Sequence, residues 1–130
     1  MEPRILIVDD HEIVREGIRT LIARSRLEWK ICGEASNAVD ALRAVQRLDP
    51  DVVILDVTMP GTSGLEVSQR IKNLGLRSRV LIFTVHDTER VATEARAAGA
   101  QGYVLKSQAS RDLVTAVECL LADDTFFASS

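Results

Sequence analysis

Cysteine, proline and aromatic residues are scarce in this chain of 130 residues, which holds two cysteines, three prolines and 4% aromatic residues. The two cysteines, Cys32 and Cys119, are too few for a disulfide framework or a zinc cluster, so we predict reduced, buried thiols of structural use. No apolar run approaches the roughly 20 residues that cross a membrane. The apolar run at residues 5–8 is also too short for a signal peptide. The sequence therefore predicts a cytoplasmic protein without membrane contact.

An excess of basic residues is also absent, because the formal net charge is −3 and the sequence pI is about 5.4. No basic field is available to attract DNA, RNA or anionic lipid, so a second domain would have to read any nucleic acid. The length fits one domain, which we predict over residues 1–122. Residues 123–130 are either a tail, whose Phe126 and Phe127 fold back on the sheet, or the start of a linker to a further domain.

Short apolar runs alternate five times with stretches of helical periodicity. Strands are predicted at residues 4–8, 29–34, 51–55, 79–83 and 101–105, and most are rich in valine, isoleucine and leucine. This composition is typical of parallel strands covered on both faces. The pattern predicts an α/β fold, a (βα)5 doubly wound five-stranded parallel sheet with right-handed crossovers. Strand order is not fixed by these patterns, but a 2-1-3-4-5 order would bring the ends of the first and third strands together.

The fourth predicted helix, residues 88–98, has little to bury. Its inward positions carry Val91, Ala92, Ala95 and Ala98. At about 0.8 kcal/mol per buried methylene, such a face gains several kcal/mol less than the leucine and valine face of the fifth helix. We expect this helix to dock weakly and to be able to move.

Four of the predicted strands run into residues that can handle a phosphoryl group or a metal, namely Asp9 with Asp10, Asp56, Thr84 and Lys106. The carboxyl ends of parallel strands share one edge of the sheet, where open α/β sheets bind their ligands. Two carboxylates 4 Å apart repel by about 4 kcal/mol at an effective dielectric constant of about 20, so three of them need a cation. Oxygen ligands of this kind favour Mg²⁺ or Mn²⁺. The simpler alternative is that Asp9 and Asp10 cap a helix N-terminus.

A carboxylate at this edge can attack phosphorus and form an acyl phosphate. Phosphoryl transfer depends on positioning and on charge neutralisation more than on acid–base chemistry. The cation would hold the transferring oxygens, the Lys106 ammonium would balance charge, and the Thr84 hydroxyl would donate to a phosphoryl oxygen.

The runs VDDHEIVREGIRTLI, DVVILDVTMPGTSGLE and GYVLK, with the pair Thr84 and His86, resemble the receiver domain of bacterial two-component response regulators. The likeness covers nearly the whole chain. The first run and GYVLK are most similar to the LuxR/NarL-type subfamily, whose output is a helix-turn-helix domain. The resemblance implies a flavodoxin-like receiver fold and a phosphorylation-activated switch, not a turnover enzyme.

Carried over by position, the resemblance implies that Asp56 is the phosphoacceptor and that a sensor histidine kinase is the donor. It also implies that Asp9, Asp10, Asp56 and the backbone carbonyl of Thr58 hold Mg²⁺.

Three further roles follow from the same resemblance. Lys106 pairs with the phosphoryl group, Thr84 senses it, and Tyr103 turns inward when Thr84 moves. The altered surface would then meet a partner or a second copy in a homodimer, and DNA would be reached only through an output domain missing from this chain. The sequence departs from many receivers at Ser107, where they carry proline, which leaves the geometry of that loop open.

Two histidines and two rival functions remain. We interpret His11 as a surface residue of the first helical turn and not as a metal ligand, and His86 as either an inert loop residue or one that tunes a rate. A Mg²⁺-dependent phosphohydrolase of the haloacid-dehalogenase kind would need an Asp-x-Asp nucleophile, whereas here the acids are adjacent. A phosphate-independent interaction module would not need every switch position to be present.

Overall fold

Helices and strands alternate along the chain, of which the computed structural model describes residues 2–26, 28–86 and 89–127. The elements are β1 (Arg4–Val8), α1 (Glu12–Ser25), β2 (Lys30–Ala35), α2 (Ala38–Leu48), β3 (Val52–Leu55), α3 (Gly64–Asn73), β4 (Arg79–Thr84), α4 (Glu89–Ala97), β5 (Gly102–Leu105), the 3₁₀ turn Lys106–Gln108, α5 (Ala109–Leu121) and β6 (Phe126–Phe127). The five predicted strands are all present, and each begins or ends within one residue of the prediction.

All strands of the sheet are parallel, in the order β2-β1-β3-β4-β5-β6. The 2-1-3-4-5 order of the doubly wound fold is confirmed, and a sixth strand extends it. Phe126 and Phe127 form this strand beside Gly102 and Tyr103 of β5. Of the two alternatives for these phenylalanines, folding back on the sheet is therefore the observed one.

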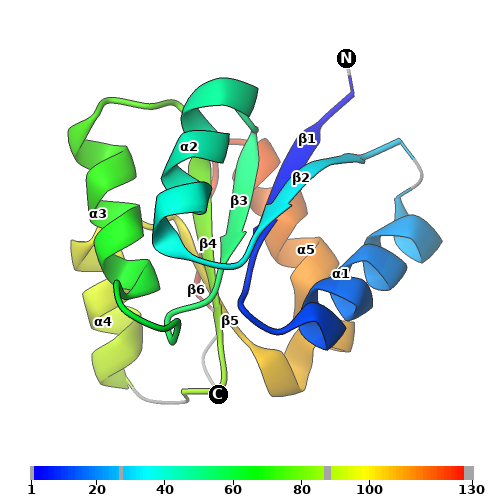
Figure 1. Ribbon diagram of the computed structural model, residues 1–130. Coiled ribbons are helices and arrows are strands. Elements are labelled where there is room, and N and C mark those ends of the chain that lie inside the picture. The colour runs from blue at the N-terminus through cyan, green and yellow to red at the C-terminus, as the bar shows by residue number, and fades with distance from the viewer. Residues whose placement is uncertain (1, 27, 87–88, 128–130) are drawn as a thin grey trace.

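The sheet is covered on both faces, as Figure 1 shows, with α2, α3 and α4 on one side and α1 and α5 on the other. Alternate residues of each strand point into opposite layers. In β1, Leu6 and Val8 pack in the layer under α2, α3 and α4, while Ile5 and Ile7 pack in the layer under α1 and α5. This two-sided burial explains why the strands are nearly continuous apolar runs.

Local signals fix several helix ends. The Asn37 side chain accepts a hydrogen bond from the Asp40 N–H at 2.9 Å and donates to the Asp40 carboxylate at 3.0 Å, which is a variant of the capping box. Gly75 and Gly99 follow α3 and α4 with φ of 68° and 85°, a backbone conformation that favours glycine at helix ends.

Helix α4 buries less than α5, as predicted. Ala95 is the buried residue within α4, with Val91 and Ala92 only partly buried. Helix α5, in contrast, buries five residues, three of them large and apolar: Leu113, Val117 and Leu120. The predicted ease of movement of α4 stays a prediction.

The predicted burial of the thiols is wrong in degree, because Cys32 and Cys119 are free but only half-buried. Burial still raises the pKa of the Cys32 thiol above its ordinary value. Within the residues that the structure describes, no helix combines the length and the apolar character that crossing a membrane requires.

Candidate functional site

The topology brings the predicted site residues to one edge of the sheet. Asp9 follows β1 and Asp56 follows β3, and these two strands are hydrogen-bonded neighbours. Thr84 ends β4, and Lys106 follows β5, the next two strands in the sheet. Residues nearly a hundred positions apart therefore converge because the strand ends are adjacent.

Asp9 is almost completely buried, with 1% of its surface exposed, and both of its carboxylate oxygens are engaged. One oxygen accepts a hydrogen bond from the Lys106 ammonium at 2.7 Å, and the other accepts the His11 N–H at 2.9 Å. The buried charge is thus paired with a cation, which offsets part of the cost of removing it from water.

Asp56, 3% exposed, lies beside this pair. Its backbone N–H donates to the Val8 carbonyl at 3.0 Å, which fixes it to β1. One carboxylate oxygen lies 3.3 Å from the Thr58 N–H and 3.5 Å from the Lys106 ammonium. Burial and the nearby charge of Asp9 raise the pKa of Asp56 above its ordinary value, and they outweigh Lys106 and the Thr58 N–H, which lower it.

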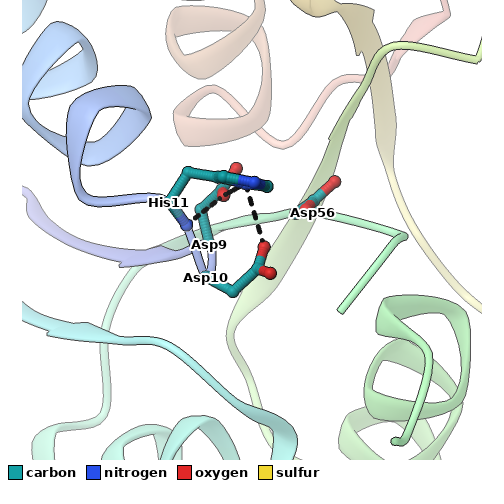
Figure 2. A group of neighbouring side chains, drawn as sticks. All are labelled: Asp9, Asp10, His11 and Asp56. Carbon is teal, nitrogen blue, oxygen red and sulfur yellow. Dashed lines mark hydrogen bonds and ion pairs between the residues drawn. The ribbon is translucent and has the colours of Figure 1, made fainter. Parts of the chain in front are cut away.

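The acidic cluster, by which we mean Asp9, Asp10 and Asp56, can hold a metal ion. Carboxylate oxygens of the three residues and a ring nitrogen of His11 all lie within 4.8 Å of one another, and Figure 2 shows them gathered at the ends of β1 and β3. One oxygen of Asp10 is buried and makes no hydrogen bond to the residues described, and the His11 Nδ1 atom is its ion-pair neighbour at 3.1 Å. A buried carboxylate oxygen that lacks a hydrogen bond, in an oxygen-rich cluster, fits a hard divalent cation.

His11 lies closer to the cluster than predicted. It is exposed, as expected, but its Nδ1 atom lies 3.2 Å from an oxygen of Asp9 and 3.1 Å from one of Asp10 (Figure 2). The alternative in which the acidic pair caps a helix is not seen. Helix α1 begins at Glu12, with His11 as its N-cap residue, and no side chain caps it.

A chain of hydrogen bonds leads from the acceptor to Tyr103, and its centre is His86. The His86 Nε2 atom lies 2.9 Å from the Thr58 hydroxyl, and the His86 N–H donates to the Thr84 hydroxyl oxygen at 3.2 Å. The Tyr103 hydroxyl donates to the His86 carbonyl. The two interpretations of His86, an inert loop residue and one that tunes a rate, both stay predictions.

Thr84 and Tyr103 are both buried, with 0% and 3% of their surfaces exposed. Because the Thr84 oxygen accepts a hydrogen bond, its own proton stays available for donation. The Tyr103 ring, predicted to turn inward during switching, is already inside the molecule here. Sequence reasoning missed the contact between Thr58 and His86, and only their places at neighbouring strand ends could have suggested it.

Residues 5–118 match the response regulator receiver domain family. The chain belongs to this family. It is 36% identical over 113 residues to the nitrate/nitrite response regulator protein NarL of Escherichia coli K12, which covers 87% of the chain and 52% of NarL. It is 33% identical over 130 residues to the virulence regulator BvgA of Bordetella pertussis, across the whole chain and 61% of BvgA.

The fold agrees with this membership. A LuxR-family two-component response regulator from Aurantimonas sp. SI85-9A1 superposes with a TM-score of 0.91 at 41% identity, covering 97% of this chain and 89% of that one. The receiver fold and the LuxR/NarL-type subfamily, both predicted, are therefore confirmed. The chain spans between half and two thirds of the length of these curated relatives.

Proposed function

We propose that Asp56 is the phosphoacceptor of this receiver domain and that a sensor histidine kinase is its donor. In the transfer, an Asp56 carboxylate oxygen bonds to phosphorus while the phosphorus–nitrogen bond of the kinase phosphohistidine breaks and its electron pair stays on the imidazole. The observation that carries this proposal is the placement of the buried Asp56 carboxylate beside Asp9 and Asp10, with the Lys106 ammonium 3.5 Å away.

The residues of the site fit Mg²⁺, which we propose is held by the acidic cluster and the backbone carbonyl of Thr58. When bound, the ion neutralises charge on the transferring oxygens. Lys106, which bridges Asp9 at 2.7 Å and Asp56 at 3.5 Å, would exchange part of this pairing for the phosphoryl oxygens. Mn²⁺ has the same ligand preference and would serve as well.

Thr84 and Tyr103 would carry the signal away from the site. The free Thr84 proton would be donated to a phosphoryl oxygen, which would move the loop that also holds the His86 carbonyl bonded to Tyr103. Movement of α4 would then alter the surface made by α4, β5 and α5, as in a two-state switch that a covalent group biases. A second copy of this chain would bind the altered surface.

The regulated output is proposed to be a helix-turn-helix domain in the same protein, because the chain matches only 52% of the response regulator NarL and 61% of the transcription regulator BvgA. Residues 1–122 would be the receiver domain, and residues 123–130 its C-terminal tail, which adds β6 to the sheet and would lead to the connection. The cytoplasmic location and the absence of turnover activity stay predictions.

The test is incubation with phosphoramidate and Mg²⁺, followed by intact-mass measurement of wild type and Asp56→Asn. We expect one phosphoryl group on wild type, none on the variant and none when EDTA is present. Phosphorylation of Asp56→Asn at the wild-type rate would refute the assignment. Steady release of phosphate from small esters would instead favour a phosphohydrolase, and indifference to both phosphodonor and Mg²⁺ would favour an interaction module.

A further inference from the structure

Gly64, the first residue of α3, lies directly against the main chain of the acceptor residue. A Cβ atom built on Gly64 would come 1.9 Å from the Asp56 carbonyl oxygen, 2.8 Å from its carbonyl carbon and 3.1 Å from the Val57 Cα. Real Cβ atoms keep at least 3.0 Å from such neighbours, so any side chain here would push the Asp56 peptide and α3 apart by about 3.0 − 1.9 = 1.1 Å.

This contact differs in kind from those at the other glycines, all of which the structure describes. A Cβ at Gly33, Gly99 or Gly102 would come within 3.0 Å only of side-chain atoms of leucine or lysine, which can rotate away. Gly61 and Gly75 have positive φ and open space around them. At Gly64 the backbone conformation does not require glycine, so the close approach of the acceptor main chain does.

A hydrogen bond reinforces the contact. The Gly64 N–H donates to the Val57 carbonyl at 2.9 Å, and this bond closes the loop of residues 57–63 that follows the acceptor. The same loop contains Thr58, whose N–H approaches the Asp56 carboxylate. The start of α3 and the end of β3 therefore form one packed unit that determines where the acceptor carboxylate lies.

We propose that Gly64 is a positioning residue for phosphoryl transfer, which sets the depth of the Asp56 carboxylate in the site. The inference rests on the proposed role of Asp56. A displacement of about 1.1 Å is a third of the 3.5 Å that separates Asp56 from Lys106, and it would also open the acidic cluster. Errors of about 1 Å in the placement of a reacting group can cost roughly a hundredfold in rate.

The test compares Gly64→Ala with Gly33→Ala, a matched control on β2 whose added methyl meets the Leu48 and Leu6 side chains away from the site. Three quantities are measured at 25 °C: the Mg²⁺ dissociation constant by calorimetry, the rate of phosphorylation by phosphoramidate at saturating Mg²⁺, and the melting temperature. We expect Gly64→Ala to bind Mg²⁺ about tenfold more weakly and to be phosphorylated at least about tenfold more slowly. Gly33→Ala should stay within about twofold of wild type in both, whatever its melting temperature.

A folded Gly64→Ala with wild-type Mg²⁺ affinity and phosphorylation rate would overturn the proposal, as would equal losses in Gly33→Ala. If Gly64→Ala does not fold, it is placed in a Gly17→Ala background, because alanine at this open position within α1 should stabilise the helix. Failure to fold there too would show that the contact serves the fold and would overturn the proposal. A wild type that binds Mg²⁺ but is not phosphorylated on Asp56 would refute the proposed function alone, and the Mg²⁺ affinities would still test the role of Gly64.

Discussion

Replacing Asp56 by asparagine should make the metal-free domain more stable. Oxygens of the acidic cluster lie within 4.8 Å of one another, so Asp56 is repelled by each of Asp9 and Asp10 by at least about 3.5 kcal/mol at an effective dielectric constant of about 20. Lys106, at 3.5 Å, returns about 4.7 kcal/mol. The net repulsion is about 2 kcal/mol, which corresponds to about 8 °C in melting temperature for a domain of this size.

The pH dependence of this gain has a definite sign. The folded-state pKa of Asp56 is raised, so the folded protein holds this proton more tightly than the unfolded chain. Stability therefore falls as pH rises from the ordinary value of 3.8 through the raised pKa, and the full penalty is present above the raised pKa. The advantage of Asp56→Asn should be largest above the raised pKa and should vanish below the ordinary pKa of the carboxyl.

Mg²⁺ should reverse the order of stability. At one hundred times its dissociation constant, a ligand of the folded state adds about 2.7 kcal/mol, or about 11 °C here. Asp56→Asn lacks one ligand and should gain much less. Thermal unfolding followed by circular dichroism, in EDTA and in Mg²⁺, measures both effects, with Glu2→Gln as the control for loss of an exposed carboxylate. If Asp56→Asn melts below wild type in EDTA while Glu2→Gln is unchanged, repulsion within the cluster does not control stability and the reasoning fails.

Three other substitutions test other parts of the structure. His86→Ala removes the contact between the His86 ring and the Thr58 hydroxyl, and one lost hydrogen bond of about 1 kcal/mol corresponds to about a fivefold change in rate. We therefore expect the lifetime of the phosphoryl group to fall about fivefold in a dephosphorylation assay. An unchanged lifetime would argue against a role for the ring. Burial raises the pKa of Asp51, but hydrogen bonds from Arg77 and the Arg4 N–H outweigh it and lower the pKa. Asp51→Asn should therefore lower the free energy of unfolding by about 1–2 kcal/mol at pH 7, as measured by urea unfolding. That difference should shrink as pH falls through the lowered pKa, and a difference independent of pH would contradict the assignment. Phe127→Ala should lower the free energy of unfolding by about 2 kcal/mol and speed hydrogen exchange in β5. Unchanged stability and exchange would show that β6 does not stabilise the sheet.

The strands and the site could be predicted because their signals are local and repeated. Each strand is an apolar run of valine, isoleucine and leucine, and a parallel sheet then places every strand end at one edge. This reasoning brings Asp9, Asp56 and Lys106 together without any knowledge of side-chain contacts, and the structure places them within ion-pair distance of Lys106. The strand order came from the resemblance and from the switch-point rule, not from the periodicity.

Features that depend on a single contact could not be predicted. A strand of two residues, Phe126–Phe127, has no periodicity to detect. The position of His11 depends on the turn in which the Asp9 carboxylate accepts the His11 N–H, and this turn carries the ring to Asp10. The close approach of Gly64 to Asp56 depends on where α3 starts relative to β3, which no pattern in the sequence specifies.

Because α4 buries little apolar surface, its attachment to the domain depends strongly on a few polar and aromatic contacts. At its C-terminal end, the Ala98 carbonyl accepts a hydrogen bond from the buried Ser68 hydroxyl of α3. Along its length, the Arg96 guanidinium lies 3.9 Å from the centre of the Phe127 ring. Phe127 pairs with Tyr103 in the sheet, and the Tyr103 hydroxyl bonds to the loop before α4. Because few apolar contacts hold the helix, we predict that a change at that loop acts against little packing energy and that β6 moves with α4.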